Sequence, residues 1–173
     1  MPAFDPLTYR YASRRNVVYA KNAVACTSVP LGAQIGLDVM KSGGNAVDAA
    51  VATAFAVGVC EPNLSGIGGC GMMNIYLADN HEYEILEYME TVPVAVEPGW
   101  YNPETDSATA KNAAVPGQVA GLLTALEKYG TMTREEVLAP VIQLAEEGFD
   151  VHISFEERAS ASFDKLVQNE EAA

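Results

Sequence analysis

A nearly uncharged alanine- and valine-rich segment at 46–59 constrains the fold of this chain more than any other feature. Asp48 is its only ionisable side chain, and Asn45 stands at the N-cap position three residues earlier, which is a capping-box-like pattern. A helix that is apolar on every face must be buried on all sides. About 14 residues span about 21 Å, which is too short for a bilayer. We therefore predict a core helix at 46–59 around which everything else packs.

Length and charge limit the classes of protein and partner. The 173 residues are 49% hydrophobic, so we expect a single domain over 1–173 with a sizeable core and an extended arm at 1–15. The formal net charge is −13, from 23 acidic and 10 basic residues. Because binding to phosphate groups needs clustered Lys and Arg, this balance argues against nucleic acid and against an anionic membrane surface as partners.

Turn and cap residues divide the rest of the chain into helices and strands, which predicts a mixed α/β (α+β) fold. In chain order we expect two short β-like runs within 16–28, a helix from Pro30 to Gly43-Gly44, the helix at 46–59 ended by Glu61-Pro62, a hairpin of strands 72–77 and 83–88, an irregular loop at 92–112, a helix after Pro116-Gly117, a helix capped by Thr133 and Glu136, and a last helix from near Ser154.

The cysteines and the N-terminal residues predict a cytoplasmic protein. Cys26, Cys60 and Cys70 are an odd number and contain no C-x-x-C pair, so we expect free, buried thiols in a reducing compartment, with no disulfide framework and no metal site. The first 20 residues contain no continuous apolar run of the kind found in a signal peptide.

The glycine cluster at 66–71 matches the dinucleotide-binding pattern G-x-G-x-x-G only in its letters. That fingerprint works when it follows a strand and opens a helix, and here a helix precedes it and a β-like run comes after it. No Walker lysine is present. We therefore expect close backbone packing and no cofactor. A free-standing nucleotide-binding domain is the remaining, less favoured alternative.

No catalytic residue can be assigned from the sequence. Ser65 lacks the glycines of a nucleophile elbow. His81 lies in a polar turn and His152 near a helix start, far apart in the chain, so both are expected at the surface. The adjacent glutamate pairs, such as Glu146-Glu147, are expected on solvated helix faces. The residues alone therefore describe a scaffold without its own catalytic machinery.

Several segments in the same order resemble a known family. They are ACTSVPL at 25–31, KSGGNAVDAA at 41–50, EP at 61–62, SGIGG at 65–69, AVPG at 114–117, VAGL at 119–122, KYGT at 128–131 and the stretch 138–149. Together they resemble the N-terminal half of the large subunit of a gamma-glutamyltranspeptidase, over residues 16–173. The opening FDPLTYRYASRR is similar to the cytoplasmic gamma-glutamyltranspeptidase-like acylases.

The resemblance implies an N-terminal-nucleophile hydrolase with an αββα sandwich, of which this chain holds a part, with the helix at 46–59 covering the sheet. In that family a precursor cleaves itself, and the new N-terminal threonine of the small subunit attacks a gamma-glutamyl amide such as that of glutathione. No residue here matches that threonine, so we expect a truncated member that is inactive alone. Its expected partners are the remainder of the large subunit and the small subunit, or a further copy of itself.

One position departs from the family pattern in a way that concerns the substrate. The resemblance places Met89, in YMETVP at 88–93, where the family carries an arginine that pairs with the α-carboxylate of the substrate. A thioether cannot make that charge-assisted pair, which is worth about 1.5–3 kcal/mol. Three alternatives stay open: Met89 packs in the core at a strand end, the enzyme is an amide acylase with a non-glutamyl substrate, or the chain is a non-catalytic or split-enzyme subunit.

Overall fold

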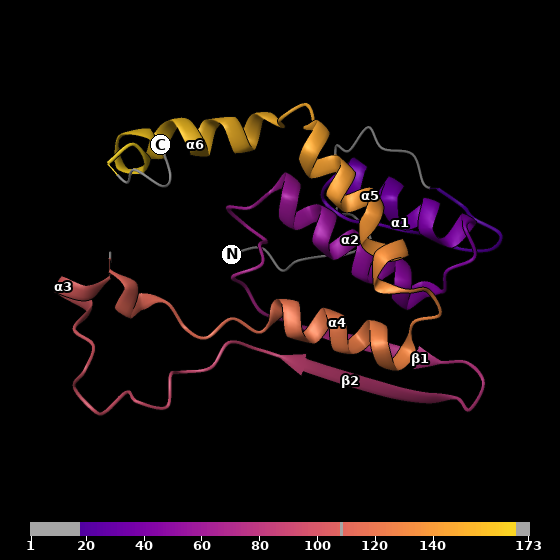
Figure 1. Ribbon diagram of the computed structural model, residues 1–173, viewed down its shortest axis with the longest axis horizontal. Helices are drawn as coiled ribbons and strands as arrows, with labels where there is room; N and C mark the ends of the chain where they lie inside the picture. Colours follow the sequence, from indigo (N-terminus) through magenta and orange to yellow (C-terminus); the bar gives the residue numbers. More distant parts are fainter. Residues whose placement is uncertain (1–17, 108, 169–173) are drawn as a thin grey trace, which may run out of the picture.

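The computed structural model describes residues 18–107 and 109–168 (Figure 1). The expected arm at 1–15 lies outside the described residues. The elements are α1 (Pro30–Lys41), α2 (Ala46–Cys60), β1 (Gly71–Leu77), β2 (Glu82–Tyr88), α3 (Pro103–Asp106), the 3-10 turn η1 (Ala110–Asn112), α4 (Gln118–Tyr129), α5 (Arg134–Glu147) and α6 (Ile153–Leu166). Along the described part of the chain, no helix is long and apolar enough to cross a membrane.

Helix α2 is the centre of the fold, as its composition predicts. The Asn45 side chain accepts from the backbone N–H groups of Val47 and Asp48, and the capping box is confirmed. Val51, Ala52 and Ala56 are completely buried. Helix α1 packs along α2, and α5 and α4 contact it from other sides (Figure 1).

The prediction that α2 is buried on all sides is wrong. Ala46 and Ala50 are exposed, and a groove of about 440 Å³ follows this side of the helix down to Val57. The far wall of the groove is the extended segment 24–27. Alanine side chains are too short to reach a neighbour across such a gap, so an apolar face stays open among the described residues.

The hairpin is confirmed, but its covering helix is not the expected one. β1 and β2 pair antiparallel, from Gly71 opposite Tyr88 to Leu77 opposite Glu82. Helix α4, rather than α2, lies directly along the sheet (Figure 1). Gly121 of α4 allows this approach, because a Cβ there would overlap the Tyr88 ring.

The two faces of the hairpin differ sharply in burial. The side chains of Met73, Ile75 and Leu86 on the α4 side belong to the core. The opposite face is exposed over large apolar side chains, which are Met72, Tyr76, Tyr83 and Ile85. No described element covers this second face.

The expected strands within 16–28 are absent from the described residues 18–28. Val18, Tyr19 and Val24 are instead exposed on an extended backbone. A β-like composition makes a strand only when a neighbour supplies ladder hydrogen bonds, and no described segment pairs with this one.

The remaining predicted helices and the irregular loop are present in the described chain. The segment 92–112 is irregular apart from the short α3 and η1, and it extends away from the helices (Figure 1). Lys111 stabilises it locally, with an ion pair to Asp106 at 3.1 Å and a position 5.2 Å from the centre of the Trp100 ring. The capping box of Thr133 and Glu136 begins α5, as predicted.

Candidate functional site

Met89 directly follows β2 and lies at the surface. Its side chain is 44% exposed, so the alternative that it packs in the core is not supported by the structure. Two residues further on, Thr91 forms an antiparallel bridge with Val115, through N–H···O distances of 3.3 and 2.9 Å. Met89 therefore stands at a position that the bridge and the hairpin hold from both sides.

The glycine cluster and the start of α4 meet beside the end of β2. The carbonyl oxygen of Gly69 accepts from the N–H groups of Gly117 and Gln118 at 3.1 and 3.0 Å. Gly117 has to be a glycine, because a Cβ there would overlap the carbonyl oxygen of Tyr88. The backbone fits together closely at Gly69 and Gly117, whereas Gly68 within the cluster has open space around it. Helix α2 before the cluster and strand β1 after it give the reverse of the nucleotide-binding order.

Glu90 supplies the charge beside Met89. A hydrogen bond with the Cys70 thiol lowers the pKa of Glu90 and raises the pKa of Cys70. Glu90 is therefore paired with Cys70, and Met89 is the exposed residue that precedes Glu90 in the chain. We call Cys70, Met89, Glu90 and Thr91 the strand-end site.

Sequence reasoning singled out Met89 but missed Glu90 and Cys70. They are 20 positions apart in the chain, and only the pairing of β1 with β2 brings them together. The available signal was the hairpin itself, since the residue before β1 and the residues after β2 must be neighbours.

The predicted cysteine environments are right in part. All three are free, and Cys60 is buried while Cys70 is partly buried. Cys26 is exposed, which corrects the expectation that all three are buried. The open groove beside α2 explains this, because Cys26 lies on its outer wall.

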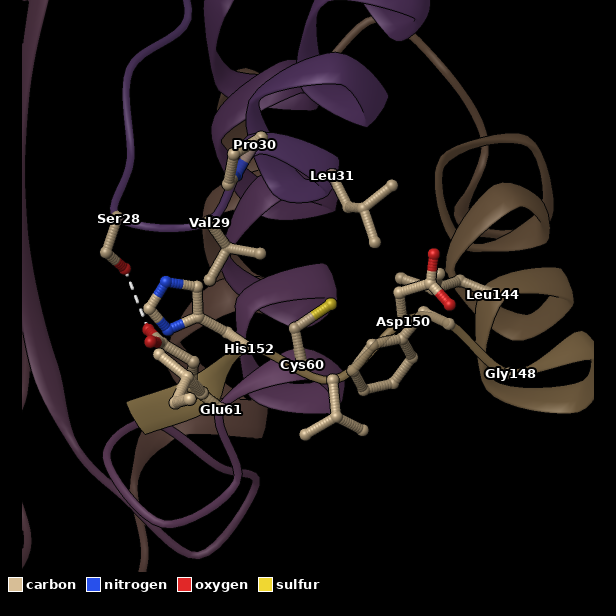
Figure 2. A pocket seen from close by; sticks show the side chains of 13 residues that line it. Ser28, Val29, Pro30, Leu31, Cys60, Glu61, Leu144, Gly148, Asp150 and His152 are labelled. Carbon is tan, nitrogen blue, oxygen red and sulfur yellow. Dashed lines mark hydrogen bonds between the residues drawn. The ribbon is translucent and has the colours of Figure 1, made fainter. Parts of the chain in front are cut away.

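The two histidines lie in separate places. His81 lies in the hairpin turn, where its Nδ1 is 2.8 Å from the hydroxyl oxygen of Tyr76. His152 follows α5 and lines a cavity with Ser28 and Glu61 (Figure 2). Across the described residues, no group of three or more His, Cys, Asp or Glu side chains is arranged to hold a metal ion.

Comparison with known proteins identifies the family to which this chain is similar. The family model described as gamma-glutamyltranspeptidase matches residues 32–173. The glutathione hydrolase proenzyme of Bacillus subtilis (strain 168) is 38% identical over 164 residues, which cover 90% of this chain and 28% of that relative. The chain therefore spans little more than a quarter of the length of this curated relative.

Solved structures show the same similarity in three dimensions. The gamma-glutamyltranspeptidase of Helicobacter pylori superimposes with a TM-score of 0.84 at 32% identity, covering 91% of this chain and 47% of the other. The cephalosporin acylase of Bacillus halodurans gives a TM-score of 0.77 at 35% identity, covering 96% of this chain and 32% of the other.

Proposed function

The chain belongs to the gamma-glutamyltranspeptidase family, and on that premise we propose that it forms part of the large subunit of an N-terminal-nucleophile enzyme. The proposed reaction is transfer or hydrolysis of gamma-glutamyl groups on glutathione-like amides. The family match over residues 32–173 supports it. The exposed apolar face of the hairpin is consistent with one half of an αββα sandwich, whose second sheet lies on other polypeptide.

We propose that the 173-residue chain does not catalyse this reaction alone. Amide cleavage of this kind needs a nucleophile beside a base, and no residue of the sequence can be assigned to that role. The purified chain should release no p-nitroaniline from gamma-glutamyl p-nitroanilide. Release above the enzyme-free rate would contradict the proposal.

A second candidate is an amide acylase whose acyl group carries no α-carboxylate at this position. One observation favours it: Met89 is exposed, and a thioether at the position that the resemblance assigns to an arginine suits an apolar or neutral acyl group better than an anionic one. Two relatives of this chain are named as acylases. They are the cephalosporin acylase of Bacillus halodurans and acylase ACY 1 of a Pseudomonas strain, which is 33% identical.

A chimaera separates the two candidates. The matching part of the Bacillus subtilis proenzyme is replaced by this chain, and self-cleavage on a gel reports correct folding. If Met89 excludes gamma-glutamyl groups, Met89→Arg should raise kcat/KM for gamma-glutamyl p-nitroanilide by about tenfold or more.

The matched control is Gln143→Arg, which adds the same charge on the exposed face of α5. It should leave kcat/KM unchanged. A chimaera that self-cleaves and hydrolyses the gamma-glutamyl substrate equally well with Met89 or with arginine would refute the acylase candidate and favour the first one.

We propose further that the chain pairs with the remainder of the enzyme, or otherwise with itself, through the uncovered hairpin face.

Three free cysteines support a reducing, cytoplasmic location. The net charge of −13 supports the absence of nucleic acid from its partners.

A further inference from the structure

A cavity of about 620 Å³ lies where the start of α1, the end of α2 and the segment 148–153 come together (Figure 2). This volume is in the range of small-molecule sites, about 300–1,000 Å³. None of the strand-end residues lines it.

One end of the cavity is polar and ordered. The Ser28 hydroxyl donates to Oε2 of Glu61 at 2.8 Å, although the two residues are 33 positions apart. The imidazole of His152 lies beside this pair in Figure 2. The hydrogen bond holds the Glu61 carboxylate in one orientation at the cavity wall.

The charges around the cavity are mainly negative. Its lining includes the carboxylates of Glu61 and Asp150 and no Lys or Arg. Helix α2 ends here at Cys60 with no basic residue in its last turn, so the negative end of its dipole is not neutralised on its own helix. The N-terminus of α1 adds a partial positive charge, and the imidazole of His152 lies beside Glu61. The two carboxylates and the end of α2 outweigh these groups.

The other walls are apolar. They come from α1, from α5 and from the segment leading to α6, and they include Leu31, Leu144, Phe149 and Ile153. The Cys60 thiol adds no charge, because burial raises its pKa. These apolar walls favour an organic cation, whose body they can contact.

We propose that the cavity binds a protonated primary amine with an apolar body of about the size of a phenyl group. The ammonium group lies against Glu61, and the apolar body contacts Leu31 and Phe149. An ammonium offers three donors and one positive charge, which matches the Glu61 carboxylate that Ser28 already holds in place.

Calorimetric titration of the 173-residue chain with 2-phenylethylamine tests this. We expect saturable binding at one site, with 2-phenylethanol binding at least about tenfold more weakly because it carries no charge. Glu61→Gln should raise the Kd about tenfold or more, since it removes the charge and keeps the shape. Glu127→Gln, an exposed carboxylate on α4 outside the cavity, is the matched control and should leave the Kd unchanged.

Two further variants keep the test decisive if Glu61→Gln fails to fold by circular dichroism. Asp150→Asn removes the second lining charge, and Leu31→Trp fills the apolar part of the cavity. Weaker binding in both supports the proposal. The proposal is overturned if the amine does not saturate, if the alcohol binds as tightly as the amine, or if binding to a folded cavity variant equals that to the unchanged chain.

Discussion

Replacing Asp48 with alanine should strongly destabilise the fold, because this carboxylate joins the two halves of the helical core. Asp48 is completely buried and accepts from the Asn45 N–H at 2.7 Å, within its own capping box. It also accepts from the Thr131 hydroxyl at 2.7 Å and from the N–H groups of Thr131 and Met132 at 3.0 and 3.2 Å. These last bonds attach the N-terminus of α2 to the turn between α4 and α5.

The loss of stability depends on which N–H and O–H donors are left without any acceptor once the Asp48 carboxylate is removed. Thr131 is exposed, so water can replace Asp48 at its hydroxyl and N–H. The N–H groups of Asn45 and Met132 are less accessible, and each should cost about 1–2 kcal/mol when left without an acceptor, giving about 3 kcal/mol in all. Urea unfolding followed by circular dichroism measures this free energy.

The acid dependence of stability is a second readout for the same residue. Burial raises the pKa of Asp48, but the hydrogen bonds from the Thr131 hydroxyl and from the backbone N–H groups outweigh it and hold the pKa below the ordinary aspartate value. A carboxyl whose folded pKa is depressed contributes its full stability above its unfolded pKa, about 3.9, and loses it as the pH falls through the folded pKa. Asp48→Asn should therefore lose most stability at neutral pH and little at the acid end.

Asp79→Asn, in the exposed hairpin turn, is the matched control and should leave the unfolding midpoint where it is. The reasoning would be refuted if Asp48→Ala unfolded within about 0.5 kcal/mol of the unchanged chain, the range of ordinary surface substitutions. It would also be refuted if Asp48→Asn lost as much stability at pH 3 as at pH 7.

Three other properties can be measured on the same chain. Gly117→Ala should lower the free energy of unfolding by about 1–3 kcal/mol, because the added Cβ would overlap the end of β2. Gly68→Ala, at a position with open space around it, should leave the free energy of unfolding unchanged, and equal effects of the two variants would argue against the close approach at Gly117. Cys26 should react with a disulfide reagent well before Cys60, whose burial raises its thiol pKa; a faster Cys60 would contradict the burial. The chain should self-associate in light scattering, and Ile85→Lys on the uncovered hairpin face should shift it towards monomer; a monodisperse unchanged chain would contradict this.

Local signals in the sequence predict most of the helices and the hairpin correctly. The capping boxes at Asn45 and at Thr133 are each recognised from two residues three positions apart. The polar turn at 79–81 joins strands that are adjacent in the chain. Such features depend on neighbours a few positions away, so the sequence alone contains the information needed to recognise them. The family resemblance is of the same kind, because it rests on short motifs in a fixed order.

Contacts between distant positions could be decided only by the tertiary structure. The sequence identifies Asp48 as part of a helix cap. In the structure its carboxylate also accepts a hydrogen bond from Thr131, 83 positions away. Residues 18–28 have a β-like composition without a described partner strand, and the all-apolar α2 keeps one open side. Met89 is singled out by its position in the sequence, but its exposure, like the approach of Glu90 to Cys70, depends on how β2 pairs with β1. Burial and strand pairing both require contact with a second surface. A sequence pattern shows that one surface is suited to burial or pairing, but it does not identify the surface that will contact it.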